Sequence, residues 1–344
     1  MGMPAPVPDR PTVSVIVPAR NEEACLAICL ESLVSQEGIS KEILVVDDHS
    51  TDRTWQTAQS FPGVRVIEAG PLPTGWSGKN NALTAGAQQA RGQWLLFTDA
   101  DTVHKPGSLA RAVAEAEAHS ADLLSYSPEQ EVHGLWERAV MPVIFAELAR
   151  KYPPSKISDG SSGLAAANGQ YLLISRAAYD AVGGHRAVAS SLLEDVALAR
   201  AVRDASGAIR FRYGGEAVRT RMYRGFQQLR EGWTKNLELL FPEVVPLAIW
   251  RTAEFLVVVG CVTLGMWAGA RGDWKHAVFY LLPPALSVAR IATAHFSWSS
   301  NFLGILGLPV FSYLLLRSKL LRARGTVSWK GRTYPGGADI KPVA

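Results

Sequence analysis

Two aspartates separated by one residue, Asp99 and Asp101, directly follow the short apolar run Trp94–Phe97. The run has the length and the two-sided apolar character of a buried parallel strand. Ligands of open α/β sheets bind beyond the carboxyl ends of the strands, and residues i and i+2 of an extended segment point the same way. Two carboxylates placed there suit a hard divalent cation whose shell is completed by phosphate oxygens and water. A solvated turn that contains two acids is the alternative.

Three further polar clusters lie after a predicted strand or before a predicted helix, at residues 20–22, Asp47–Asp48 and Gly78–Lys79. An acid at a strand end can bind the ribose hydroxyls or the base of a nucleotide. A lysine at a helix start, together with the free N–H groups of that helix, can hold a diphosphate. Each cluster alone is compatible with a turn or a solvated helix start. The coincidence of all of them with Asp99 and Asp101 favours a nucleotide site.

The acid pair Glu194–Asp195 opens a predicted helix whose apolar positions continue through Val202. The positive end of a helix favours ionised carboxylates. A carboxylate beside an acceptor hydroxyl can take its proton. Taken without context, two ordinary helix-start acids are the simpler interpretation.

Strands and helices alternate along the first two thirds of the chain. The apolar runs predict strands at residues 13–17, 42–46, 64–67, 94–97, 122–126 and 171–174. Helices are expected between them, with Asn21 as the cap of the first and residues 183–185 as a turn. This alternation predicts a parallel, right-handed α/β sheet. The helix at 135–152 suits either the core or a membrane surface, and its apolar face favours the core.

The composition excludes a disordered chain, because 48% of the 344 residues are hydrophobic and 19% are charged. The net charge is +4, and its basic excess lies late in the chain, which fits anionic lipid better than nucleic acid. Cys25, Cys29 and Cys261 form no disulfide framework and are expected to be reduced thiols in the cytosol. The first ten residues are rich in proline and contain no apolar run, so no signal peptide is expected.

Three apolar runs occupy the last third, at residues 246–270, 277–296 and 302–316. A membrane span needs about 20 apolar residues, so the first run is the strongest candidate. Buried helices of a soluble domain are the alternative. Three full crossings would separate the basic tail from the nucleotide site, although basic segments stay on the cytosolic side. We therefore expect an even number of crossings, with the run around Pro283–Pro284 re-entrant or interfacial.

Taken together, the motifs resemble those of the family 2 glycosyltransferases of the GT-A fold, in the order of that family over about residues 12 to 240. The matching segments are residues 18–23, 45–52, 78–83, 99–101 and 194–195. His49 departs from the glycine that is more common in the family, and a histidine tolerates the left-handed conformation of such a turn.

The resemblance implies a role for each matching residue. The nucleotide sugar would be held by Pro18, Arg20, Glu22, Asp48, Lys79 and Asp99. Within that set, Lys79 would touch the diphosphate, and Asp99 would contact the ribose or the metal. Asp101 would bind Mn2+ or Mg2+. Asp195 would be the catalytic base of a direct displacement with inversion.

The acceptor side departs from the membrane-bound polysaccharide synthases of the family, which carry Gln-x-x-Arg-Trp. Here Gln227 and Arg230 have that spacing, but Trp233 comes three residues after the arginine. Residues 231–236 and 329–334 resemble instead the branch that glycosylates carotenoids and other lipids. This places Glu194, Arg230, Trp233 and Lys235 on the acceptor or diphosphate side.

The resulting expectation is an α/β chain with a GT-A, Rossmann-like and mostly parallel sheet flanked by helices, followed by C-terminal membrane helices. Its parts are a disordered N-terminus (1–11), the GT-A domain with an interfacial helix at its end (12–242), membrane helices (243–320) and a basic cytosolic tail (321–344). It would be a hexosyltransferase of the cytoplasmic membrane that adds one sugar to a lipid. A processive polysaccharide synthase and a non-catalytic nucleotide-binding membrane protein are the alternatives.

Overall fold

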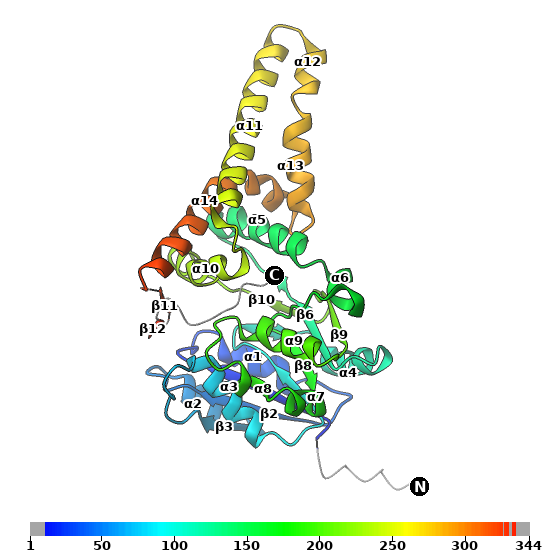
Figure 1. The fold of residues 1–344 in the computed structure, drawn as a ribbon, viewed down its shortest axis with the longest axis vertical. Helices are drawn as coiled ribbons and strands as arrows, with labels where there is room; N and C mark the ends of the chain where they lie inside the picture. Colours follow the sequence, from blue (N-terminus) through cyan, green and yellow to red (C-terminus); the bar gives the residue numbers. More distant parts are fainter. Residues whose placement is uncertain (1–10, 326, 330–331, 335–344) are drawn as a thin grey trace. The chain divides into compact units, whose positions relative to one another are not determined.

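The computed structural model describes residues 11–325, 327–329 and 332–334 (Figure 1). The expected disorder of residues 1–11 and most of the expected basic tail lie outside these residues. The chain forms two compact units, residues 1–129 with 154–220 and residues 130–153 with 221–344. Each unit is described by itself.

The first unit contains a seven-stranded sheet of order β3-β2-β1-β4-β8-β6-β9. Its strands are β1 (Val13–Ala19), β2 (Lys41–Asp47), β3 (Val64–Glu68), β4 (Trp94–Phe97), β6 (Leu123–Ser127), β8 (Leu172–Ser175) and β9 (Ile209–Tyr213). All neighbours are parallel except β8, which runs antiparallel to both β4 and β6. The prediction of a mainly parallel α/β sheet is confirmed, with one reversed strand in its interior.

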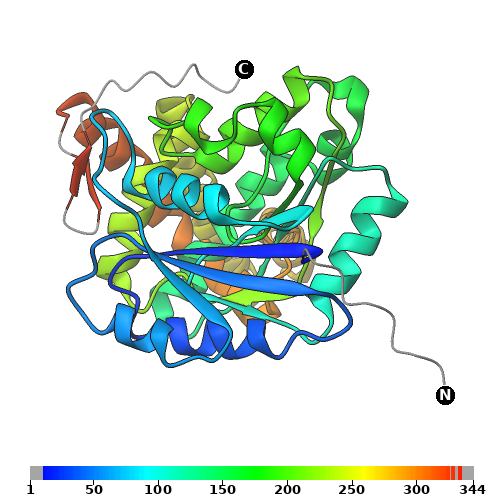
Figure 2. The same cartoon turned by 90° about the horizontal axis from the view of Figure 1, so that it is seen from below.

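Helices cover both faces of this sheet, as Figure 2 shows for α1 (Leu26–Val34) and α3 (Gly78–Gln89). Helix α1 packs with Val15 and Val17 in the main core. Helix α3 approaches the other face so closely that a Cβ on Gly86 would meet Ile16 Cγ2 at 2.5 Å, so this position requires glycine. The remaining helices of the unit are α2 (Thr54–Gln59), α4 (Ser108–Ala118), α6 (Pro154–Ser158), the 3-10 turn Gly160–Ser162, α7 (Arg176–Ala181), α8 (Gly184–Ala187) and α9 (Glu194–Asp204).

Short strands complete the unit: β5 (Thr102–His104) pairs antiparallel with β10 (Val218–Thr220), and β7 (Glu129–Gln130) lies at the division between the units. The turn expected at residues 183–185 is found at Gly183, which has φ 76° and leads directly into the short helix α8. His185, in α8, is buried, and its backbone N–H donates to the hydroxyl of Tyr179. A backbone N–H that lies away from water needs such an acceptor.

The second unit consists of α5 (Leu135–Lys151), α10 (Phe226–Leu240), α11 (Val244–Ala270), α12 (Trp274–Phe279), α13 (Leu282–Ala292), α14 (Trp298–Ala323) and the hairpin strands β11 (Val327–Trp329) and β12 (Arg332–Tyr334). Helices α11 and α14 are long and apolar enough to cross a membrane. The second apolar run divides into α12 and α13 just before Pro283–Pro284, because proline suits the first turn of a new helix. Helix α5 buries Val140, Val143 and Ile144, as its apolar pattern predicts.

Candidate active site

The loops after β1 and β2 are joined by direct hydrogen bonds. Arg20 donates from Nη1 to the carbonyl oxygen of Asp48 at 2.7 Å, and the same atom lies 3.9 Å from Asp48 Oδ2. The backbone N–H of Glu22 donates to Thr54 Oγ1 at 2.8 Å. Pro18 is the sixth residue of β1, directly before this loop. The nucleoside-side residues expected from the sequence therefore lie on two adjoining strand ends.

Two residues of these loops adopt the left-handed backbone conformation, Asn21 with φ 53° and His49 with φ 57°. Asn and His are among the side chains that tolerate this region best. The expected conformation of His49 is thus confirmed, whereas the capping role of Asn21 is wrong. Its side-chain oxygen accepts from the N–H of Thr51 at 2.8 Å, because helix α1 begins only at Leu26.

Asp99 and Asp101 lie in a tight turn between β4 and β5. The hydroxyl of Thr102 donates to the carbonyl of Asp99 at 2.7 Å, and the hydroxyl of Thr220 donates to the carbonyl of Asp101 at 3.1 Å. Beneath the turn lies the buried thiol of Cys29, whose pKa is raised to about 12 by burial and by the nearby carboxylates of Asp101 and Asp99. This thiol stays protonated, so Cys29 is part of the floor of the turn.

Lys79 is positioned by the start of helix α3. Ser77 caps the helix by accepting from the N–H of Asn80 at 3.1 Å, and the Asn80 amide donates to the carbonyls of Val188 and Ala189, both at 2.9 Å. A capped first turn fixes the direction in which Lys79 leaves the helix.

The ammonium group of Lys79 bridges two carboxylates. Its Nζ lies 2.7 Å from Asp99 Oδ1 and 2.7 Å from Glu194 Oε1. Burial lowers the pKa of Lys79, but these two carboxylates outweigh it and raise the pKa well above its ordinary value. Lys79 therefore carries a permanent positive charge between helix α9 and the turn that carries Asp99 and Asp101. Such a charge suits a diphosphate.

Asp195 is held by two backbone donors. Its Oδ2 accepts from the N–H of Gly169 and its Oδ1 from the N–H of Val196, each at 2.8 Å. Burial, and next the charge of Glu194, raise the pKa of Asp195 to about 6. Such a carboxylate is ionised at neutral pH and is a stronger base than an ordinary aspartate.

Gly169 lies at the centre of this group, and the sequence did not single it out as a site residue. A Cβ added there would lie 3.2 Å from Lys79 Nζ, 3.3 Å from Glu194 Oε1 and 3.4 Å from Asp195 Oδ2. One sequence feature could have indicated Gly169: the segment Asn168–Gln170 lies directly before strand β8, in a loop rich in small residues.

Asp99 and Asp101 offer carboxylate oxygens, which are hard ligands of the type that Mn2+ and Mg2+ accept. Among the residues that the structure describes, no group of three His, Cys, Asp or Glu side chains is arranged to hold a metal by itself. The pair fits a cation whose remaining ligands come from the donor diphosphate and water.

Arg230, Trp233 and Lys235 lie on α10, in the second unit. Trp233 is buried there against Met141 and Phe145, so it is a packing residue of this unit. Nε of Arg230 is buried and has no hydrogen-bond partner in the described part of the chain. The grouping of Lys79, Asp99, Glu194 and Asp195 is thus built by the first unit alone.

The chain is similar to known glycosyltransferases. Residues 14–179 match the model of glycosyl transferase family 2. The 4,4'-diaponeurosporenoate glycosyltransferase of Staphylococcus aureus (strain MRSA252) is 26% identical over 349 residues, which cover 94% of this chain and 88% of that protein. The protein of the same name from strain USA300 has the same identity and coverage.

Two solved structures also align with the chain. One is a mannosyltransferase from Pyrobaculum calidifontis in complex with GDP-Man and Mn2+. It is 18% identical, the alignment covers 91% of this chain and 87% of that chain, and the TM-score is 0.49. The other is TarS 1–349 of S. aureus. It is 18% identical, the alignment covers 88% of this chain and 90% of that chain, and the TM-score is 0.44. The family match includes the loops that carry Arg20, Asp48, Lys79 and Asp99, and the comparisons together support a family 2 glycosyltransferase that resembles the carotenoid glycosyltransferases.

Proposed function

We propose that this glycosyltransferase moves one hexose from a nucleotide-diphosphate sugar to a membrane lipid, with inversion at the sugar carbon. The observation that carries the proposal is the group formed by Lys79, Asp99, Glu194 and Asp195 at the strand ends of the first unit. It combines a fixed cation for a diphosphate with a carboxylate whose pKa is about 6.

The donor lies along the loops after β1, β2 and β4. Arg20 and Asp48, which are linked by a hydrogen bond, form the nucleoside end together with Pro18 and Glu22. Lys79 binds the diphosphate through its ammonium group, which the two carboxylates at 2.7 Å keep positively charged. When bound at Asp99 and Asp101, Mn2+ or Mg2+ supplies further positive charge for the diphosphate.

The transfer step uses Asp195. The acceptor hydroxyl oxygen forms a bond to the anomeric carbon, the bond from that carbon to the diphosphate oxygen breaks, and Asp195 takes the hydroxyl proton. The N–H groups of Gly169 and Val196 hold the carboxylate in place. A single displacement of this kind inverts the anomeric configuration.

Three observations support a lipid acceptor. The relative that aligns over 94% of the chain is named for a carotenoid substrate. Residues 231–236 and 329–334 have the pattern of that branch. Helix α11 is apolar and only 17% of its most apolar window is buried. These observations support a location in the cytoplasmic membrane with the catalytic unit in the cytosol, and our proposal assigns Arg230 and Lys235 to the acceptor or diphosphate side.

The test is sugar transfer by the purified, detergent-solubilised protein. UDP-glucose, UDP-galactose, UDP-N-acetylglucosamine and GDP-mannose are offered in turn, with Mn2+ or with EDTA, with and without a total lipid extract. A metal-dependent sugar–lipid product from one donor is expected. Long water-soluble chains would identify a processive synthase instead. Donor binding without any turnover would identify a non-catalytic nucleotide-binding protein.

A further inference from the structure

We propose that α11, α12 and α13 form a hairpin that crosses a lipid bilayer twice, and that α14 does not cross it. This inference concerns the second unit alone and does not depend on the transferase activity. It commits to lipid hydrocarbon as the partner of an apolar surface that no described residue covers.

The outgoing limb, α11, is exposed around more than half of its circumference. From Leu256 onward, its large exposed apolar side chains, between 40% and 73% accessible, are Leu256, Val257, Val259, Val262, Leu264, Met266 and Trp267. Only 17% of its most apolar window is buried. A core helix of a soluble protein would be mostly buried, so this surface requires an apolar solvent.

The returning limb consists of α12 and α13 and is equally apolar. Val278, Phe279, Leu282 and Leu286 are 53% to 66% exposed. The two limbs touch through small residues, since a Cβ on Gly265 would lie 3.4 Å from the carbonyl oxygen of Ala277 and one on Gly269 would lie 3.8 Å from Ala277 Cβ. Two glycines four positions apart permit the close helix contact that is common within membranes.

Polar groups mark both ends of the hairpin. Its tip carries four exposed polar side chains: Arg271, Asp273, Lys275 and His276. Its base carries Arg251, Glu254 and Arg290. From Glu254 to Arg271 the helix rises about 25 Å, close to the roughly 30 Å of bilayer hydrocarbon. The long Arg271 side chain extends to the interface.

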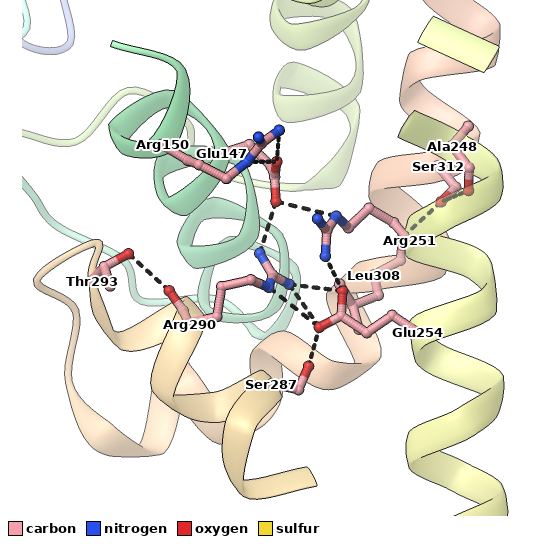
Figure 3. Close-up of polar contacts among 10 residues, drawn as sticks. All are labelled: Glu147, Arg150, Ala248, Arg251, Glu254, Ser287, Arg290, Thr293, Leu308 and Ser312. Atoms are coloured by element: carbon pink, nitrogen blue, oxygen red, sulfur yellow. Dashed lines mark hydrogen bonds and ion pairs between the residues drawn. The ribbon is translucent and has the colours of Figure 1, made fainter. Parts of the chain in front are cut away.

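The charges at the base are paired with one another, as Figure 3 shows. Arg290 lies 2.7 Å from Glu147 Oε1 and 3.0 Å from Glu254 Oε1, and Arg251 lies 3.2 Å from Glu147 Oε1 and also contacts Glu254. Unpaired charges at membrane depth are costly. This four-residue ion cluster therefore lets α5, α11 and α13 meet at the membrane surface.

Helix α14 differs from α11 although it is as long. Half of its most apolar window is buried, and a Cβ on Gly307 would overlap the carbonyl oxygen of Ala139 in α5. Its last turns carry Arg317, Lys319, Arg322 and Arg324, which stay on the cytosolic side. The hairpin thus supplies the expected even number of crossings. It differs from the expectation in one respect, because the Pro283–Pro284 run is its returning limb and α14 is the helix that does not cross.

The experiment uses the full chain in right-side-out and inside-out membrane vesicles, with a membrane-impermeant maleimide. In a background in which the native cysteines are replaced, Gln88→Cys marks the first unit, Lys275→Cys marks the tip and Arg324→Cys marks the end of α14; all three positions are exposed. We expect Gln88→Cys and Arg324→Cys to be labelled from one face and Lys275→Cys only from the opposite face. A fourth protein that keeps only the native Cys261, midway along α11, should react with a lipid-soluble maleimide and resist the impermeant one.

Labelling of Lys275→Cys and Gln88→Cys from the same face would overturn the double crossing. Labelling of Arg324→Cys from the face of the tip would show that α14 crosses. Carbonate extraction of the unmodified chain gives an independent test, because an inserted hairpin stays in the membrane pellet. Release into the supernatant would show that a protein partner covers the hairpin and would overturn the proposal.

Discussion

The backbone N–H of Gly169 donates a 2.8 Å hydrogen bond to Oδ2 of Asp195. This contact links the loop before β8 to the first turn of α9, two segments that are far apart in the sequence. It fixes the orientation of a carboxylate whose pKa is raised to about 6 by burial and by Glu194. The position of the proposed base, Asp195, therefore depends directly on the backbone at Gly169.

The substitution Asp195→Asn should lower kcat by about 10²–10⁴-fold, the usual contribution of a general base. Donor affinity should stay within about twofold, because the amide keeps the size and the acceptor oxygen of the carboxylate. Single-turnover transfer and equilibrium donor binding measure the two quantities. Asp204→Asn, at the exposed end of the same helix, is the control. Loss of less than about tenfold would remove Asp195 from the role of base.

The rate should depend on pH through the same group. Asp195 must be ionised to accept a proton, and the charged form predominates only above its pKa of about 6. We therefore expect kcat/KM to rise about tenfold per pH unit below that value and to level off above it. The residual activity of Asp195→Asn should lack this acidic limb. A wild-type profile that is flat from pH 5 to 7 would contradict the assignment.

Gly169→Ala should reduce transfer by about 10- to 100-fold while the fold is retained. The added methyl group would lie 3.2 Å from Lys79 Nζ and 3.4 Å from Asp195 Oδ2, so the charged groups must shift, and small displacements of catalytic groups are costly. Gly260→Ala is a matched control, since a Cβ there meets nothing within 4 Å. If the two variants had equal activity and equal thermal stability, transfer would not depend on the absence of a side chain at residue 169.

The sequence predicted the sheet and the strand-end clusters well, because strand periodicity and loop chemistry are local signals. Lys79 and Asp99 were assigned to one site from their loops alone. The second contact of Lys79, with Glu194, depends on where α9 packs. The position of Gly169 depends on the reversed strand β8, which follows it. Such contacts between distant segments leave no pattern in a single sequence.

The same limit explains the error at residue 21. Asn21 has the composition of a helix cap, but a left-handed backbone directs its side chain to the N–H of Thr51. In the apolar last third of the chain, composition ranked the three runs as candidate membrane spans, but it did not predict which helices are buried. The contrast between the exposed α11 and the half-buried α14 comes from α5, which packs against α14.

Removal of the Asp101 carboxylate should separate metal-dependent from metal-independent donor binding. For the wild-type enzyme, Mn2+ should tighten binding of the nucleotide sugar, and EDTA should reverse the effect. Asp101→Asn should lose this stimulation, because a neutral amide is a weaker ligand for a hard cation. Asp180→Asn, an exposed acid on α7, is the control. Equal stimulation of Asp101→Asn and wild type, measured by titration calorimetry, would exclude Asp101 as a ligand.

Loss of the Glu147 charge should destabilise the second unit strongly. The Glu147 side chain is fully buried, and its Oε1 lies 2.7 Å from Arg290 and 3.2 Å from Arg251. Removing one partner of a buried ion pair leaves uncompensated charge and costs about 3–5 kcal/mol. Glu147→Gln should therefore lower the thermal unfolding temperature in detergent by several degrees and increase the reactivity of Cys261.

Arg150 provides the matched control for this variant. Its guanidinium also contacts Glu147, at 3.2 Å, but its side chain is 62% exposed. An exposed ion pair contributes about 0–1 kcal/mol, because water screens it. Arg150→Gln should therefore leave the unfolding temperature nearly unchanged. If Glu147→Gln were equally mild, the cluster would not hold the base of the hairpin, and α11 would be positioned by its contacts with α14 instead.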